Sequence, residues 1–194
     1  DGLSMFIGRE ISGKSENNFF YNNTLIGNRT NISLGPHFES KSVSNIEFKN
    51  NISFCPNDTT CIDIDTDNNW ISKFKWGNNA WTRNPNYANS HGDTMVGGQF
   101  QKILGWQNLT NIPNARDFSM NSENPCIDAG LVLSKSYSLG IDSMISNYIP
   151  QLPGGISVRT ISQNQFRDHW DMGAIVFQSV DKAPLPPKKL NLSN

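Results

Sequence analysis

The sequence predicts an all-β fold, a right-handed parallel β-helix with three-strand coils, a period of about 29 residues and an irregular C-terminal cap. Two observations lead to this prediction. The 194 residues include 26 Asn and 15 Gly, which disfavour helix interiors and favour turns between short strands. Short apolar-x-apolar stretches also recur through residues 1–67 at a nearly constant spacing, which is typical of stacked repeats.

The first set of matches relates three short strands. The spacing from Leu3 to Ile32 is nearly the same as the spacing from Ile32 to Ile62. A strand of a few residues cannot bury its apolar face alone, so equivalent strands must stack. We therefore expect Ile32 to lie between Leu3 and Ile62 on adjacent parallel strands, with all three side chains pointing inward.

The second set of matches relates residues 18–26 to residues 46–54 at an offset of 28. In both copies a strand leads to an Asn-Asn pair and then to another strand. Asn tolerates the left-handed backbone of a sharp corner, and its side-chain amide can bond the equivalent Asn of the next coil, about 4.8 Å away. The ladders expected from this match are Asn22 over Asn50 and Asn23 over Asn51.

The period fades after Asp67, and we expect the rest of the chain to close the solenoid. The predicted organisation is the last β-helix coils at residues 1–67, C-terminal strands and a cap of the same domain at residues 68–180, and a Pro-rich linker or tail at residues 181–194. Short strands are expected at residues 117–120 and 174–177, with one short helix between Asp142 and Pro150.

The charge balance limits the partners. The net charge is −1 and the pI is about 6.3, so we expect no nucleic-acid partner. No apolar run approaches the ~18 residues of a membrane span. The chain begins at Asp1 in a strand-like pattern, and we interpret it as a processed product or part of a longer protein. On the open edge of its first coil we expect upstream β-helix coils, or another copy or chain, to stack.

Several motifs extend the fold prediction into the second half. They are Asn-Asn-Ala-Trp at residues 78–81, Gly92-Asp93 followed by Phe100, Asp-Phe-Ser-Met at residues 117–120, Asn-Pro-Cys-Ile-Asp-Ala-Gly at residues 124–130 and Asp-Met-Gly-Ala at residues 171–174. Together with the preceding coils, they resemble the C-terminal end of secreted members of the pectin-lyase-like superfamily. The resemblance implies a right-handed parallel β-helix and a secreted or cell-surface location. It does not fix the function, because the superfamily contains polysaccharide lyases, glycoside hydrolases, adhesins and surface-layer proteins.

Aromatic residues near residue 80 are the candidate carbohydrate-binding site. Trp76, Trp81 and Tyr87 could stack on sugar rings with Arg83 beside them, and the alternative is that the tryptophans form the core of the cap. A polysaccharide lyase needs a basic side chain and a cation that neutralises the uronate. The residues here with suitable chemistry are Lys75, Arg83 and His91. Nothing in the sequence brings them together, so no catalytic residue is assigned.

The three cysteines divide into a pair and a single residue. Cys55 and Cys61 flank a short loop, and we expect a disulfide between them in an exported protein, with two buried thiols as the alternative. For Cys126 the resemblance implies burial in the cap, because members of the superfamily carry small residues at this position.

Two further motifs bear on metal binding and on glycosylation. The acidic series Asp63, Asp65 and Asp67 resembles the start of a calcium loop, but it lacks the required Gly and bidentate Glu, so we expect no metal or cofactor, with calcium as the alternative. Asn-x-Ser/Thr occurs seven times. Asn22 and Asn51 belong to turns inside coils, where a glycan would disrupt stacking. The better glycosylation candidates are Asn28, Asn57 and Asn108.

Two functions remain open from the sequence. The first is an extracellular or cell-surface β-helix module, structural, adhesive or carbohydrate-binding, without a catalytic site in this chain. The second is the C-terminal part of a polysaccharide lyase or glycoside hydrolase whose catalytic coils lie upstream. The first is preferred, because no pair of a base and a neutralising cation is recognisable.

Overall fold

The computed structural model describes residues 3–7, 15–26, 30–34, 43–54, 60–64, 74–81, 94–95, 120, 122–142, 158–165 and 168–178. These residues form an all-β arrangement built mainly of parallel sheets, which agrees with the predicted class at that level. The helices among them are short 3-10 turns, η3 (Lys135–Tyr137) and η4 (Gln163–Gln165). None of the described residues belongs to a helix long and apolar enough to cross a membrane.

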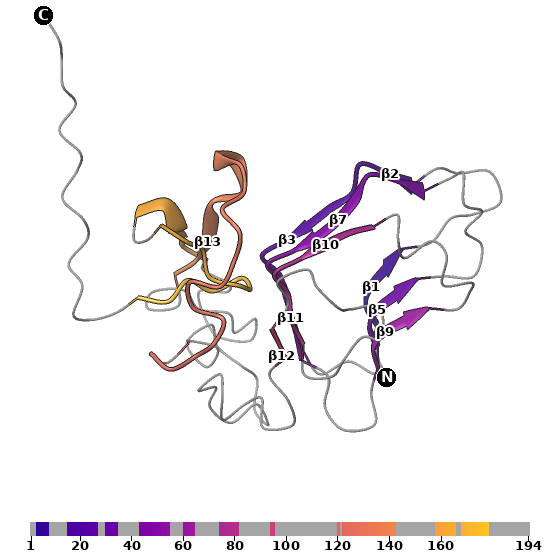
Figure 1. Ribbon diagram of the computed structural model, residues 1–194, viewed down its shortest axis with the longest axis horizontal. Helices are drawn as coiled ribbons and strands as arrows, with labels where there is room; N and C mark the ends of the chain where they lie inside the picture. The colour runs from indigo at the N-terminus through magenta and orange to yellow at the C-terminus, as the bar shows by residue number, and fades with distance from the viewer. Residues whose placement is uncertain are drawn as a thin grey trace, which may run out of the picture.

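Three parallel sheets are built from strands of successive repeats (Figure 1). The first sheet has the order β1 (Leu3–Ile7), β5 (Thr30–Leu34), β9 (Thr60–Ile64). The second has the order β10 (Phe74–Gly77), β7 (Ile46–Lys49), β3 (Phe19–Tyr21). The third has the order β12 (Thr94–Met95), β11 (Ala80–Trp81), β8 (Ile52–Phe54), β4 (Thr24–Ile26). The short strands β2 (Ser15–Glu16) and β6 (Val43–Ser44) also pair in parallel.

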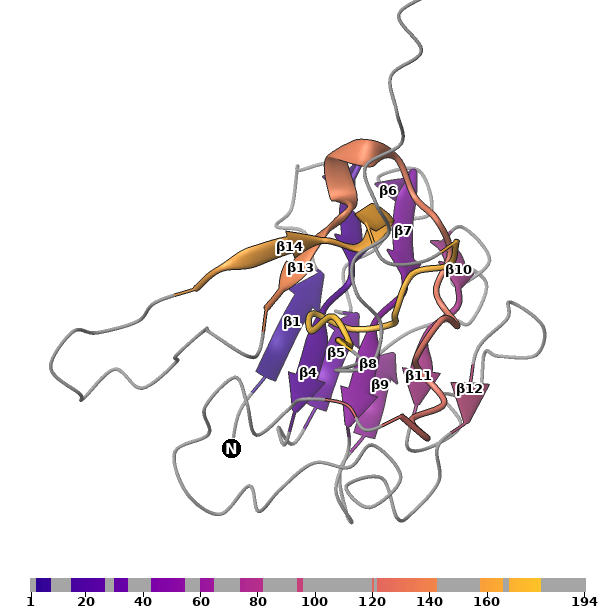
Figure 2. The ribbon, with the colours of Figure 1, turned by 90° about the vertical axis from the view of Figure 1, so that its left-hand side faces the viewer.

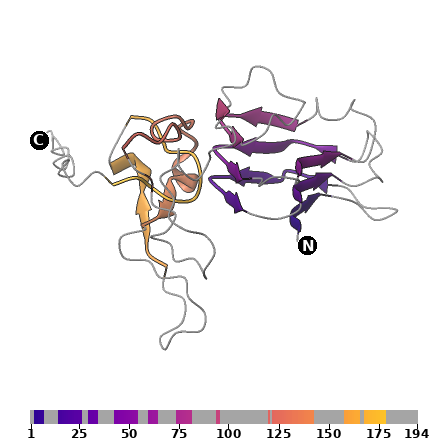
Figure 3. The same cartoon turned by 90° about the horizontal axis from the view of Figure 1, so that it is seen from below.

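The chain visits these three sheets in the same order in successive repeats. β3, β4 and β5 are followed by β7, β8 and β9, and each later strand pairs in parallel with its counterpart. Figure 3 shows strands of successive repeats lying side by side. Each short strand is therefore held mainly by its equivalents in adjacent repeats rather than by its neighbours in sequence.

The register of the first sheet agrees with the sequence prediction on one side and differs on the other. Ile32 pairs with Ile62, as expected. On the other side Ile32 pairs with Met5, whereas Leu3 lies opposite Thr30. The predicted position of β1 is therefore wrong by two residues. A shift of two leaves every side chain on the same face of the strand, so alternation alone could not detect it.

The repeat continues beyond Asp67, where the sequence prediction ended it. β10 pairs with β7, and β11 pairs with β8. The Asn pairs keep a spacing of 28 residues from Asn23 to Asn51 and again from Asn51 to Asn79. The sequence prediction placed residues 78–81 among the motifs of the C-terminal end and so missed this third copy. The domain limits proposed from the sequence stay predictions.

The described residues from 120 to 178, here called the C-terminal part, lie against the turns of the parallel sheets. Figure 2 shows the C-terminal part in front of β4 and β8. β13 (Leu139–Ile141) and β14 (Thr160–Ser162) form an antiparallel pair. The strand expected at residues 174–177 is reduced to one bridge between Ile141 and Ile175. The neighbouring amides donate elsewhere, Ala174 N to Thr24 Oγ1 and Phe177 N to Asp171 Oδ2. The helix expected between Asp142 and Pro150 and most of the strand expected at residues 117–120 lie outside the described residues.

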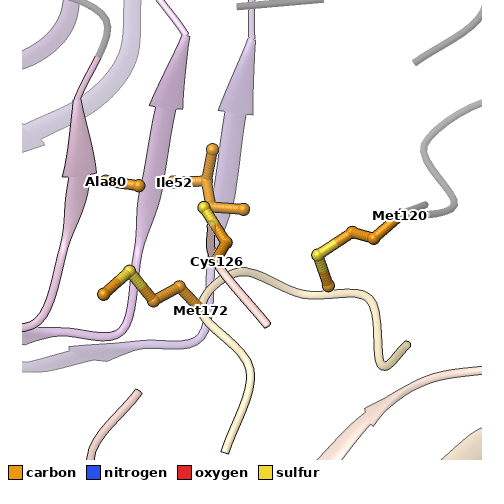
Figure 4. Packing of buried hydrophobic residues seen from close by; sticks show 5 residues of the cluster. All are labelled: Ile52, Ala80, Met120, Cys126 and Met172. Carbon is orange, nitrogen blue, oxygen red and sulfur yellow. The ribbon is translucent and has the colours of Figure 1, made fainter. Parts of the chain in front are cut away.

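A buried cluster joins the repeats to the C-terminal part (Figure 4). Ile52 of β8 and Ala80 of β11 pack with Met120, Cys126 and Met172. Cys126 is 0% exposed and its thiol is free, so its predicted burial is confirmed. The apolar interior of the repeats therefore continues directly into the C-terminal part.

Candidate functional site

Alternation along β3, β7 and β10 separates an inner row of side chains from an outer row. Phe20, Phe48 and Trp76 are partners in register and form an inner stack with ring centroids 4.8 and 4.5 Å apart. Residues at the intervening positions face the opposite side of the sheet. We call them the outer cluster, and its members are Phe19, Tyr21, Glu47, Lys49 and Lys75.

Glu47 is the centre of the outer cluster. Its Oε2 accepts hydrogen bonds from Tyr21 OH at 2.5 Å and from Lys49 Nζ at 2.6 Å. Its Oε1 accepts from Lys75 Nζ at 3.0 Å, and Lys75 Nζ also donates to Asn45 Oδ1 at 3.0 Å. The Glu47 side chain is only 11% exposed. A largely buried carboxylate is therefore balanced by two ammonium groups and a phenol.

These contacts set the protonation of the outer cluster. Burial by itself raises the pKa of Glu47, but the hydrogen bonds from Lys49, Tyr21 and Lys75 outweigh it and lower the pKa to about 2. Burial and the hydrogen bond to the Glu47 carboxylate raise the pKa of Tyr21 above its usual range. At neutral pH Glu47 is therefore ionised, and Tyr21 keeps the proton that it donates.

Aromatic rings extend the outer cluster towards the C-terminal part. The rings of Phe19 and Tyr21 are stacked with centroids 5.8 Å apart. Tyr137 of η3 meets Tyr21 edge to face at 4.9 Å, and Lys49 Nζ lies 6.0 Å from the centroid of the Tyr21 ring. Tyr21 thus connects a charged group of side chains to an aromatic one.

The second Asn of each pair forms an inner ladder through three repeats. Asn23 Nδ2 donates to Asn51 Oδ1 at 2.9 Å, and Asn51 Nδ2 donates to Asn79 Oδ1 at 2.9 Å. The backbone amides of Asn23 and Asn51 donate to the same two oxygens at 3.0 Å. Asn51 Nδ2 also donates to Phe20 O at 2.9 Å. The predicted ladder of Asn23 over Asn51 is confirmed and extends by one repeat.

The first Asn of each pair forms an outer ladder that the C-terminal part binds. Asn22, Asn50 and Asn78 have left-handed φ values of 55°, 58° and 51°, as a sharp corner requires. Asn50 Nδ2 donates to Asn22 Oδ1 at 3.2 Å, which confirms the second predicted ladder. The three amides also donate to backbone carbonyls of residues 129–137, from Asn22 to Tyr137 at 2.9 Å, from Asn50 to Leu131 at 2.8 Å and from Asn78 to Ala129 at 2.7 Å.

The motifs at residues 124–130 and 171–174 meet beside this ladder. The carboxylate of Asp171 accepts from Asp128 N at 3.0 Å and from Phe177 N at 2.7 Å, and Met172 N donates to Cys126 O at 2.9 Å. Burial and the Asp171 charge raise the pKa of the Cys126 thiol to about 12. Between the motifs, a Cβ atom at Gly130 would lie 2.8 Å from Trp170 O, so only glycine fits there.

A pocket of about 300 Å³ opens where the turn after β3 meets η3 and β13. Tyr21 and Asn22 contribute one wall, and Tyr137, Leu139 and Thr160 contribute the others. It lies next to the outer cluster, because Tyr21 belongs to both.

The structure places the sequence candidates in different environments. Trp76 is 6% exposed and Trp81 is 1% exposed, so both lie in the interior, where they meet at 6.5 Å between ring centroids. Their faces offer little area to a sugar. Of the other candidates, Lys75 lies in the outer cluster and the backbone of Cys61 lies in β9. The candidates outside the described residues are Arg83, Tyr87, His91, Cys55, Asn28, Asn57 and Asn108.

Sequence reasoning missed Phe19, Tyr21, Glu47 and Tyr137 as candidates. Extending the spacing of 28 residues past Asp67 would have placed Lys75 beside Glu47, since that spacing separates them. Tyr137 gives no such signal, because it lies in a part of the chain without repeats. The described residues contain no group of three or more His, Cys, Asp or Glu side chains arranged to hold a metal ion.

Comparisons with protein-family models, curated proteins and solved structures found no match to this chain.

Proposed function

We propose that this chain is part of a right-handed parallel β-helix and serves as a structural or adhesive module of a secreted or cell-surface protein, without a catalytic site of its own. The observation that carries the proposal is the inner ladder, in which Asn23, Asn51 and Asn79 occupy equivalent corners of three successive repeats. Repetition of strand, corner and strand in the same order is what stacked coils require. Such a stack resists deformation because each coil is bonded to its neighbours.

The outer cluster supports a structural rather than a catalytic role. A lyase base must be uncharged and free to take a proton from the substrate. The Lys75 ammonium instead donates to Glu47 and Asn45, and Glu47 also accepts from Lys49. The Glu47 carboxylate therefore binds both ammonium groups. The alternative, the end of a polysaccharide lyase or glycoside hydrolase, depends on catalytic groups outside these residues.

The edges of the parallel sheets indicate the kind of partner that we propose, further β-helix coils. Among the described strands, β1, β3 and β4 stand at the end of their sheets that belongs to the earlier repeats. This end suits further coils of the same protein or of another chain. Calcium, other cofactors and glycans are not needed for this role.

The experiment combines an activity assay with a measurement of assembly. The purified chain is incubated with pectate, alginate and neutral polysaccharides, and ultraviolet absorbance and reducing ends are followed. We expect no product, together with oligomers or aggregates by light scattering, because the sheet edges find partners. Product formation by the purified chain would support the enzyme instead, and its loss in Lys75→Ala but not in Lys135→Ala would assign Lys75 to the reaction. A stable monomer that unfolds cooperatively would contradict the proposed stacking.

A further inference from the structure

The pocket beside Tyr21 is lined by both polar and apolar residues. The polar residues with short side chains are Asn22, Ser136 and Thr160. Two aromatic residues, Tyr21 and Tyr137, and the aliphatic Leu139 also line it. The described lining residues are all uncharged. The charged residues beside Tyr21 are Glu47, which accepts a hydrogen bond from its hydroxyl, and Lys49, which forms an ion pair with Glu47.

From this chemistry we infer that the pocket binds one residue of a neutral sugar. A pyranose ring has an apolar face of C–H groups that packs on aromatic rings, and hydroxyl groups around its edge that bond amides and hydroxyls. A uronate would bring a carboxylate into a lining without a cation, which is costly. The volume of about 300 Å³ is at the small end for ligand pockets, which limits the occupant to a single ring or slightly more.

The pocket is held open by contacts that exist without a ligand. Asn22 Nδ2 donates to Tyr137 O at 2.9 Å, which fixes η3 to the turn after β3. Ile141 N donates to Ala174 O at 2.7 Å, which fixes the other side. An added Cβ at Gly140 would collide with Val176 Cγ2, so the backbone approaches closely at this position. A preformed pocket loses less conformational freedom on binding than a flexible one.

A bound sugar would bury apolar surface that is exposed at the pocket. Tyr137 is 39% exposed and Leu139 is 57% exposed. Covering such surface is favourable, in proportion to its area. The inference goes beyond the proposed structural role and does not depend on it, since the pocket exists whether or not the repeats form a complete β-helix.

The test uses the full chain and defined probes. Methyl glycosides of glucose, mannose, galactose and N-acetylglucosamine, with sodium galacturonate for comparison, are titrated and followed by NMR chemical shifts and saturation transfer. We expect at least one neutral glycoside to bind with a dissociation constant in the millimolar range, and galacturonate to bind at least tenfold more weakly. Tyr137→Ala should weaken the binding at least tenfold, because it removes an aromatic wall.

Controls distinguish a loss of sugar binding from a loss of folding. Val132→Ala changes an exposed side chain that does not line the pocket and should bind like the wild type. Thermal unfolding of each variant reports the fold independently, and Thr160→Val provides a milder change if Tyr137→Ala unfolds early. The inference is wrong if no neutral glycoside binds the folded chain, if galacturonate binds as tightly, or if the pocket variants bind unchanged.

Discussion

Asn50 and Leu131 exchange two hydrogen bonds across 81 residues of sequence. Asn50 Nδ2 donates to Leu131 O at 2.8 Å, and Leu131 N donates to Asn50 Oδ1 at 2.7 Å. The Asn50 side chain thus pairs with a backbone peptide as a neighbouring strand would. Because Asn50 also supports Asn22 in the outer ladder, this single amide joins the repeats to the C-terminal part.

Replacing Asn50 with glycine should loosen the C-terminal part without straining the corner. Glycine tolerates the φ of 58° at this position, so the loss reflects the side chain. We expect the free energy of unfolding to fall by about 2–4 kcal/mol, because the peptide groups of Leu131 lose their partner. Hydrogen exchange should accelerate at Leu131. Asn45→Gly is the matched control, with a similar φ and a more exposed ladder bond, and should cost about 1 kcal/mol or less.

Asn51, in the middle of the inner ladder, should contribute more to the free energy of unfolding than Asn23 at its end. Asn51 accepts from Asn23 and donates to Asn79 and Phe20, all in the interior or close to it. We expect Asn51→Ala to cost about 2–4 kcal/mol in chemical denaturation, and Asn23→Ala to cost roughly half as much, since fewer groups lose partners. Equal losses in the two variants would show that the ladder does not act as a connected chain.

The Glu47 cluster predicts a stability change at acidic pH. Its pKa is lowered from 4.5 to about 2, so the carboxylate stabilises the folded state above pH 4.5, and this contribution is lost as the pH falls towards 2. Glu47→Gln should be less stable than the wild type by about 1–3 kcal/mol at pH 7, with the difference shrinking between pH 4.5 and pH 2. Val132→Ala, which changes an exposed side chain and removes no titratable group, should give a small difference that does not vary with pH. The measurement is urea denaturation at a series of pH values.

Cys126 should be chemically inert in the folded protein. Burial raises the pKa of its thiol to about 12, and alkylation requires the thiolate. At pH 8 we expect iodoacetamide to leave Cys126 unlabelled in the native chain and to label it after denaturation, with peptide mass spectrometry identifying the site. Labelling at the same rate in both states would show that the contact between residues 124–130 and 171–174 opens readily.

The parts of the fold that sequence predicted are those determined by local chemistry. The Asn ladders follow from a residue type that adopts a left-handed corner and can bond its own equivalent, so spacing and identity were sufficient for Asn22 and Asn50. The position of β1 was not predictable in this way, because a shift of two residues preserves the alternation of faces. Tyr137 reaches Tyr21 only through packing of a segment without repeats, which no period encodes.

The inner ladder has a direction, and that direction bears on synthesis of the chain. The amide of Asn23 donates to Asn51 and that of Asn51 donates to Asn79, so each corner finds its acceptor in a repeat that is made later. Because a ribosome adds about 5–20 residues per second, the Asn that accepts each hydrogen bond is synthesised a second or more after the Asn that donates it. The carbonyls that bind the outer ladder, at residues 129–137, emerge later still. A nascent chain of this protein must therefore avoid aggregation while the hydrogen bonds of its Asn corners are incomplete, until the C-terminal part is synthesised and binds the outer ladder.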